Sequence, residues 1–88
     1  MAIELIKSQE GKKLSESAYK IIELIERNGI ISTSEISAEL DISIRTIHYT
    51  LRRLIETKYI IKTSYLNDKR RTRYTLNNDV IQEMKLRN

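Results

Sequence analysis

The sequence predicts a mainly α-helical domain with a small β hairpin, which places it in the α+β class. Between residues 14 and 58, apolar residues recur with helical spacing in three stretches that capping residues separate. Period-two alternation follows on both sides of Asn67-Asp68, a pair that suits a tight turn. We therefore expect the order helix, short strand, helix, helix, strand, strand, helix. The 88 residues make one domain.

The first helix is expected over residues 14–28. Its apolar residues recur at the spacing of one buried stripe, which consists of Leu14, Ala18, Ile21, Ile22 and Ile25. Gly29 follows, at the position just past a helix where φ must become positive. The pair Ile30-Ile31 is an apolar run that is long enough only for a short strand.

Two further helices are expected after this strand. Ser32 begins the second helix, because Ser32 and Glu35 have the spacing of a capping box. Residues 41–43 interrupt it, and Ser43 suits the N-cap of a third helix that runs to about Lys58. The buried stripe of the third helix consists of Ile47, Leu51 and Leu54.

The far side of the third helix carries cationic and hydrogen-bonding groups. At about 100° per residue, the outward positions are Arg45, Tyr49, Arg52 and Glu56, with Ile44, His48 and Arg53 beside them. The one acidic residue of this face, Glu56, falls in the last turns. A short helix, a turn and a longer helix with such a face form a device that enters the major groove of DNA.

Two antiparallel strands are expected over residues 59–66 and 71–76. The second strand alternates between two faces, with Tyr74 and Leu76 on one and Arg71 and Arg73 on the other. Lys69 and Arg70 stand next to the turn, so the tip of the hairpin is basic. The tyrosines expected to be core aromatics of the sheet are Tyr59, Tyr65 and Tyr74.

The two ends of the chain flank this central region. We expect residues 1–13 to form an N-terminal arm, residues 14–76 the domain, and residues 77–88 a short C-terminal helix. That helix is expected to run over residues 80–86, with Asp79 as its N-cap. Apolar residues at both ends either seal the core or build a dimer interface, which we favour; they are Ile3, Leu5, Ile6, Val80, Ile81, Met84 and Leu86.

The net charge of +4 is unevenly distributed along the chain. Residues 1–41 carry five Lys/Arg and eight Asp/Glu, residues 42–75 carry nine and two, and residues 76–88 carry two of each. Charges segregated in this way create an electrostatic field that steers a polyanion to one face of the protein. Binding there releases the counterions of the polyanion. Taken alone, a basic run is also compatible with an ordinary solvated surface. Its position directly after the third helix favours DNA.

Composition argues against several other classes of protein. The chain has no Cys and one His, so disulfides and thiolate zinc sites are excluded, and we expect no metal or cofactor. No paired carboxylates, nucleophile with a base, or glycine-rich phosphate loop stands out, so we expect no enzyme. No stretch approaches the roughly 20 apolar residues of a membrane helix, and no signal peptide is present, so we expect a cytoplasmic protein. A chain of this size also leaves little room for a small-molecule effector.

The segment SEISAELDISIRTIHYTLRRLIETKYI (residues 34–60), with the basic hairpin after it, resembles a known family. It is similar to the winged helix-turn-helix core of the MarR, ArsR and TrmB-like transcriptional regulators, particularly the small archaeal ones. The resemblance spans about residues 14–76, and the joint spacing of its residues makes it specific. The matching positions are Ser32, Glu35, Ile36, Ser43, Thr46, Ile47, Leu51, Leu54, Arg70, Arg71, Arg73 and Tyr74.

Two positions depart from the family pattern. The turn between the helices usually has Gly where this chain has Asp41, and the residue that ends the third helix is usually Gly where this chain has Lys58. We expect both positions to adopt a left-handed conformation, which costs a non-glycine residue roughly 1–2 kcal/mol.

The resemblance implies a placement on DNA. The third helix, over residues 43–58, would enter the major groove, and the wing, over residues 67–73, would lie on an adjacent minor groove or the backbone. The implied contact residues are Arg45, Tyr49 and Arg52 for base edges, Ser43 and Thr46 for phosphate, and Lys69, Arg70, Arg71 and Arg73 in the wing. Because Arg52 lies two turns after Arg45, its position favours phosphate over base edges. His48 and Arg53 stand beside this face, and each is either a DNA contact or a solvated side chain.

The sequence therefore predicts a sequence-specific transcriptional regulator that binds double-stranded DNA. We expect a homodimer that recognises a pseudo-palindrome with half-sites roughly 34 Å apart. The alternative is a winged-helix module that docks to another protein and binds no nucleic acid. The concentration of positive charge after residue 41 disfavours this alternative.

Overall fold

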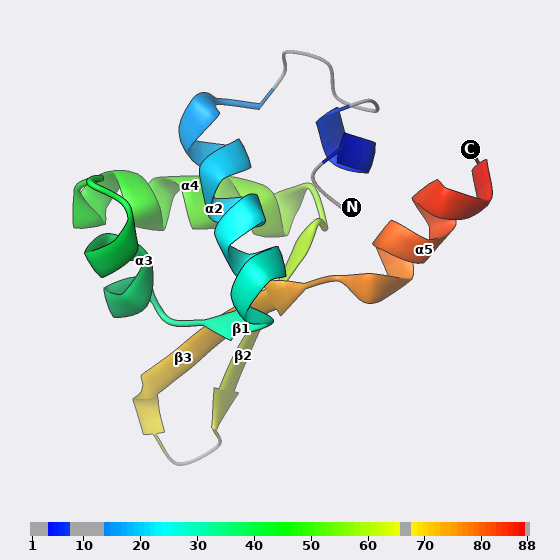
Figure 1. Ribbon diagram of the computed structural model, residues 1–88. Coiled ribbons are helices and arrows are strands. Elements are labelled where there is room, and N and C mark those ends of the chain that lie inside the picture. Colours follow the sequence, from blue (N-terminus) through cyan, green and yellow to red (C-terminus); the bar gives the residue numbers. More distant parts are fainter. Residues whose placement is uncertain (1–3, 8–13, 66–67, 88) are drawn as a thin grey trace.

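The computed structural model describes residues 4–7, 14–65 and 68–87, with side chains for residues 4–7, 14–63 and 72–86. A helical turn at residues 4–7 comes first. The elements that follow are α2 (Glu16–Asn28), β1 (Ile30–Ile31), α3 (Thr33–Glu39), α4 (Ile44–Glu56), β2 (Ile60–Tyr65), β3 (Asp68–Leu76) and α5 (Asn78–Arg87) (Figure 1). The predicted class and order, mostly helical with a small antiparallel sheet, are confirmed.

α2 begins later than predicted because Ser15 provides its N-cap. The Ala18 amide donates to the Ser15 hydroxyl at 3.2 Å, so the first helical residue is Glu16. At the other end, Gly29 has a φ of 84°, and its amide donates to the Ile25 carbonyl at 2.7 Å. The positive φ predicted for Gly29 is therefore confirmed.

α3 begins with the predicted capping box. The Glu35 amide donates to the Ser32 hydroxyl at 3.2 Å, and the Ser32 amide donates to the Glu35 carboxylate at 3.3 Å. The helix ends in extended backbone at Leu40, and the Ile42 amide donates to the Leu40 carbonyl at 2.7 Å. The prediction of a left-handed conformation for Asp41 is wrong. Asp41 is the central residue of this three-residue turn, and its φ is negative.

α4 begins after Ser43, as predicted, and ends at Glu56, before the predicted end at Lys58. Lys58 has a φ of 70°, which confirms the left-handed conformation predicted there. With this φ, the Lys58 amide donates to the Ile55 carbonyl at 3.0 Å, and the Tyr59 amide to the Leu54 carbonyl at 3.2 Å. These two bonds form a Schellman motif in which a lysine occupies the usual glycine position.

The three strands form one antiparallel sheet in the order β1-β3-β2. β3 begins at Asp68, earlier than the predicted start at residue 71, and it is the central strand. The register of β2 on β3 pairs Ile60 with Leu76, Ile61 with Thr75, Lys62 with Tyr74 and Thr63 with Arg73. A register shift follows towards the tip of the hairpin, between Thr63 and Tyr65. The short strand predicted at Ile30-Ile31 is confirmed, and it pairs with Thr75 and Tyr74.

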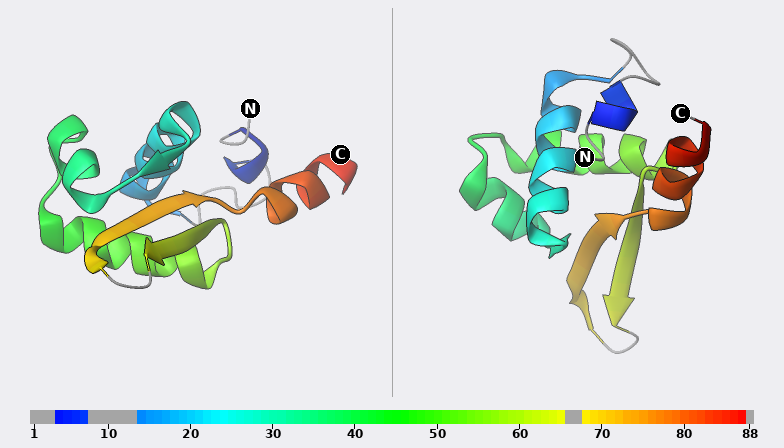
Figure 2. Two further views of the ribbon diagram at one scale, coloured as in Figure 1. Left: turned by 90° about the horizontal axis from the view of Figure 1, so that it is seen from below. Right: turned by 45° about the vertical axis from the view of Figure 1, so that its right-hand side comes forward.

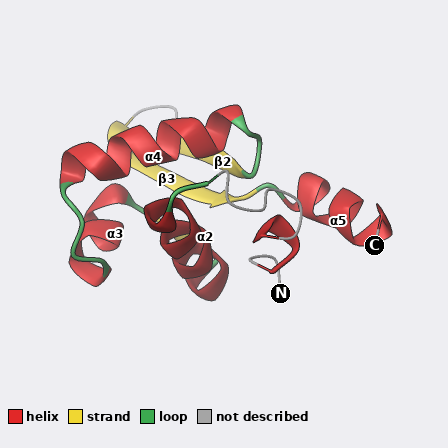
Figure 3. Cartoon of the chain, turned by 90° about the horizontal axis from the view of Figure 1, so that it is seen from above, coloured by secondary structure: helices red, strands yellow, loops and turns green. Residues whose placement is uncertain are grey.

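The core is built mainly from isoleucine. α2 crosses α4 (Figure 3), and both helices contact the sheet. The large side chains that are fully buried are Ile6, Ile21, Ile22, Ile25, Ile31, Ile36, Ile47, Leu51, Leu54 and Ile60. Tyr59 and Tyr74 are also buried, as predicted, whereas the Tyr65 side chain lies outside the described residues. The buried stripe predicted for α4 is thus confirmed.

The helical turn at residues 4–7 and α5 lie at the same end of the molecule (Figure 3). Ile6, Ile81 and Met84 are buried there in the core of the chain itself, whereas Leu86 is 86% exposed. α5 begins at Asn78, so the predicted N-cap at Asp79 is wrong, and Asp79 lies in the first turn. No helix among the described residues is long and apolar enough to span a membrane.

We expect Lys58→Gly to stabilise the protein by about 1 kcal/mol, because glycine adopts a positive φ without the steric cost of a Cβ atom. The measurement is the free energy of unfolding from urea titrations. Lys58→Ala is the matched control: it removes the same charge and keeps the Cβ atom, so it should give no gain. Equal effects of the two substitutions would contradict this account of the turn.

Candidate nucleic-acid interface

The outer face of α4 is exposed, and the hairpin of β2 and β3 projects beside it (Figure 2). The rotation of α4 is fixed by the side chains buried on its inner face, which are Ile47, Thr50, Leu51 and Leu54. Thr50 was not predicted to be buried. All the α4 residues predicted to contact DNA are exposed, namely Ser43, Arg45, Thr46, His48, Tyr49, Arg52 and Arg53.

Ser43 and Thr46 form a pair at the N-terminus of α4. The Ser43 hydroxyl accepts from the Thr46 amide at 3.2 Å and donates to the Thr46 hydroxyl at 2.9 Å. The Ser43 hydroxyl is therefore used within the cap, while the Thr46 hydroxyl keeps its own proton as a donor. Both hydroxyls lie next to the positive end of the helix dipole, which favours an anion.

Arg45 and Arg52 are the two cations of α4 without an internal partner. Neither guanidinium makes a hydrogen bond or ion pair with any described residue. They are seven residues apart, which corresponds to roughly 10 Å along the helix axis. Their donors are therefore available to an external acceptor at two points along one helix face.

Tyr49 and Arg53 form a pair that was not predicted. An Arg53 guanidinium nitrogen donates to the Tyr49 hydroxyl at 3.3 Å, and the guanidinium carbon lies 5.9 Å from the centre of the ring. The ring nevertheless remains 60% exposed. Their i, i+4 spacing is the signal in the sequence that could have revealed this contact. The pair orients an aromatic ring on the outer face of α4.

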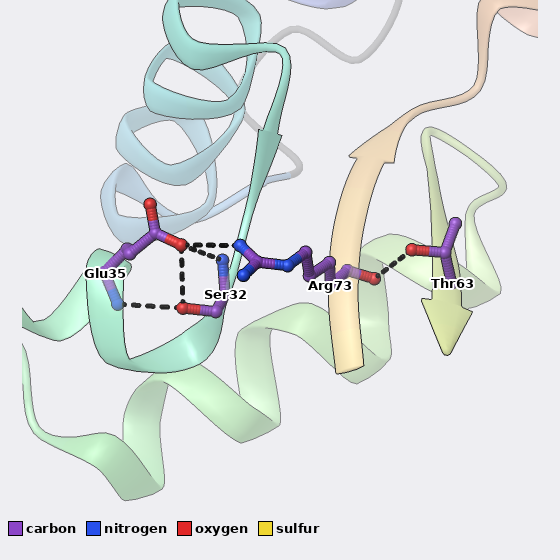
Figure 4. Close-up of polar contacts among 4 residues, drawn as sticks. All are labelled: Ser32, Glu35, Thr63 and Arg73. Atoms are coloured by element: carbon purple, nitrogen blue, oxygen red, sulfur yellow. Dashed lines mark hydrogen bonds and ion pairs between the residues drawn. The ribbon is translucent and has the colours of Figure 1, made fainter. Parts of the chain in front are cut away.

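Arg73 holds the middle of the hairpin against α3. A guanidinium nitrogen of Arg73 lies 2.9 Å from the Glu35 carboxylate, which also accepts from the Ser32 hydroxyl at 3.0 Å (Figure 4). On the neighbouring strand, the Thr63 hydroxyl donates to the Arg73 carbonyl at 3.2 Å. Arg73 was predicted as a wing contact to DNA, and the structure gives its side chain an internal partner. The side chains of Lys69, Arg70 and Arg71 lie outside the described residues.

The pKa of Glu35 is lowered by its neighbours. The largest cause is the hydrogen bond from the Ser32 hydroxyl, followed by the bond from the Ser32 amide and by the positive charge of Arg73. The carboxylate therefore stays ionised at neutral pH and serves both the cap of α3 and the ion pair to β3. One acidic group connects the helix-turn-helix to the wing.

Lys62 joins the interface from the sheet, and it was not among the predicted site residues. It is exposed on β2, and it lines two hollows beside α4 together with His48 and Tyr74. Period-two alternation could have found it, because Lys62 shares a strand face with the buried Ile60 and so faces α4. No group of His, Asp or Glu that could hold a metal ion is present among the described residues.

Residues 14–61 match the family model described as winged helix-turn-helix DNA-binding. The chain belongs to this family. The match covers α2 through the first residues of β2, which are the elements that position the exposed face of α4. Comparison with curated proteins gave no significant match.

Solved structures of MarR-family proteins share the fold at low sequence identity. A ZitR mutant from Lactococcus lactis is 24% identical with a TM-score of 0.69, and the match covers 86% of this chain and 51% of that one. Reduced MarR from E. coli is 18% identical with a TM-score of 0.71, covering 96% and 64%. A MarR mutant from E. coli complexed with operator DNA is 16% identical with a TM-score of 0.68, covering 97% and 64%.

The predicted resemblance to winged helix-turn-helix regulators of the MarR type is confirmed at the level of family and fold. The narrower resemblance to small archaeal regulators stays a prediction. The chain spans only 51% to 64% of the length of the three solved proteins named above.

Glu35→Gln should remove a contribution to stability that depends on pH. A lowered folded-state pKa stabilises the fold above the pKa of the unfolded chain, and this is lost as pH falls through the folded value. The difference in unfolding free energy between wild type and variant should therefore be largest near pH 7 and shrink below about pH 4. Glu39→Gln, in the last turn of α3, should show no such trend. A difference that is constant from pH 3 to 7 would contradict this role of Glu35.

Proposed function

We propose that this chain regulates transcription by sequence-specific binding of double-stranded DNA. α4 enters the major groove, and the hairpin lies on an adjacent minor groove or on the backbone. The observation that carries the proposal is the state of Arg45 and Arg52, two exposed guanidinium groups on one helix face with no partner among the described residues. By contrast, the Arg73 guanidinium is paired with the Glu35 carboxylate.

The contact residues divide by the chemistry of their side chains. Arg45 lies in the first turn of α4, where a guanidinium can donate two hydrogen bonds to the edge of a guanine. Thr46 offers its hydroxyl proton to phosphate next to the helix N-terminus. Arg52 lies two turns after Arg45 and serves phosphate. The Tyr49 ring, oriented by Arg53, contacts a thymine methyl group or offers its hydroxyl to the backbone.

We further propose that the protein acts in the cytoplasm as a homodimer that recognises a pseudo-palindromic site. A second copy doubles the number of base contacts, which a domain with one recognition helix needs for tight binding. The apolar Leu86 is exposed on α5. α5 lies at the end of the molecule away from the hairpin (Figure 1). The operator in the MarR complex supports double-stranded DNA as the ligand, by likeness of fold.

Arg45→Ala should relax the preference for one sequence, with a loss of about 1–3 kcal/mol on the preferred site and little loss on random duplex. Binding-site selection from randomised duplex, followed by affinity measurements on the selected and scrambled sites, tests this. Arg70→Ala, at the tip of the wing, should weaken binding to both sites alike and flatten the salt dependence.

The same titrations decide between DNA binding and the alternative of a protein-docking module. The wild-type chain should shift random duplex at low salt, with an affinity that falls steeply as salt rises. No shift at micromolar protein would favour docking to another protein. Binding that does not respond to salt would also count against the proposal, because cationic side chains supply most of its contacts.

A further inference from the structure

Two adjoining hollows lie between α4, the start of α3 and the sheet. The first, of about 310 Å³, is lined by Ser32, Thr33, Ser34, His48, Lys62, Thr72 and Tyr74. The second, of about 290 Å³, shares His48, Lys62 and Tyr74 with the first.

The chemistry of this region suits a phosphate group. Lys62 supplies an ammonium group, and its side chain makes no hydrogen bond or ion pair with any described residue. His48 is exposed on α4 and likewise has no recorded partner in the described part of the chain. Serine and threonine hydroxyls complete the lining of the first hollow. A cation beside hydroxyl and imidazole donors binds a phosphate oxygen well.

The nearest acidic side chains do not cancel this positive charge. Glu56 lines the second hollow, where Arg52 accompanies it. Glu35 directly follows Ser34, which lines the first hollow. Its carboxylate already binds the Arg73 guanidinium and the Ser32 hydroxyl. The charged and titratable groups that line the two hollows with His48 are thus Lys62, Arg52, Glu56 and Tyr74. At neutral pH the sum of the charges of these groups is positive.

We propose that His48 and Lys62 form a binding site for one backbone phosphate of duplex DNA, at the junction between α4 and β2. The inference rests on the proposed function and adds a phosphate contact that His48 of the recognition helix makes together with Lys62 of β2, a residue outside the predicted contact set. A duplex whose major groove holds α4 must bring a strand across the side of the helix, and the junction lies between that helix and the hairpin. The site fixes the position of the hairpin relative to the helix on DNA and carries no base preference.

The test compares Lys62→Gln with wild type in DNA titrations at several salt concentrations. Removal of one phosphate contact should flatten the slope of log affinity against log salt by about 0.9 and weaken binding about eightfold at 0.1 M salt. The loss should be the same on preferred and scrambled sites. Lys85→Gln is the matched control, because Lys85 lies on α5 and lines a different hollow, and it should change binding far less.

His48 adds a second, independent readout. Its imidazole lines both hollows together with Lys62, and an imidazole N–H can donate to a phosphate oxygen there. His48→Ala removes this donor, so it should weaken binding by a similar factor on preferred and scrambled sites. The circular dichroism of both variants should show that they remain folded.

The outcomes separate this site from the proposed function. If wild type shows no salt-dependent binding, the proposed function fails and this site fails with it. If wild type binds and Arg45→Ala loses sequence preference, the function stands. In that case, an unchanged salt slope in Lys62→Gln together with an unchanged affinity in His48→Ala would overturn the phosphate site alone.

Discussion

Burial of the Ile47–Leu51–Leu54 stripe is the constraint on which the rest of the structure depends. These three side chains lose their contact with water against α2 and the sheet, and each such burial contributes roughly 1.5–3 kcal/mol. A helix held along one stripe cannot rotate about its axis without exposing it. The orientation of Arg45 and every other outward side chain of α4 is therefore a consequence of core packing. The exposed face of α4 carries the polar and cationic side chains, and burial of the opposite face sets the direction in which they point.

A second set of contacts fixes the hairpin relative to that helix. The Schellman motif at Lys58 reverses the chain directly after α4, so β2 starts beside the helix that it follows. Arg73 then ties β3 to the capping box of α3 through Glu35. The same carboxylate thus completes a helix cap and an ion pair between distant segments. These links are small in energy because they are exposed, and their effect is to orient the wing.

The arrangement of cations follows from the same division between fold and interface. Among the described residues, Arg73 is paired internally, Arg53 lies against Tyr49, and Arg45, Arg52 and Lys62 have no internal partner. Paired cations stabilise geometry, whereas unpaired ones raise the local potential and attract a polyanion. The basic residues that are concentrated after residue 41 therefore do not all have the same role. Two of the unpaired ones, Arg52 on α4 and Lys62 on β2, line the same hollow.

The helices and strands were predictable from the sequence, because capping boxes, helical stripes and strand alternation are local patterns. The capping box of Ser32 and Glu35, the N-cap at Ser43 and the buried stripe of α4 lie where predicted. The sequence also predicted the outer face of α4. The sequence did not predict correctly the features that depend on hydrogen bonds in turns or between distant segments, as at Asp41, Asp68 and Asp79. Only the tertiary structure brought Arg73 to Glu35 and Lys62 beside His48, since those pairs join segments far apart in the chain. Periodicity in the sequence predicts which face of a helix or strand a residue occupies. Tertiary packing determines which residues of other segments that face contacts.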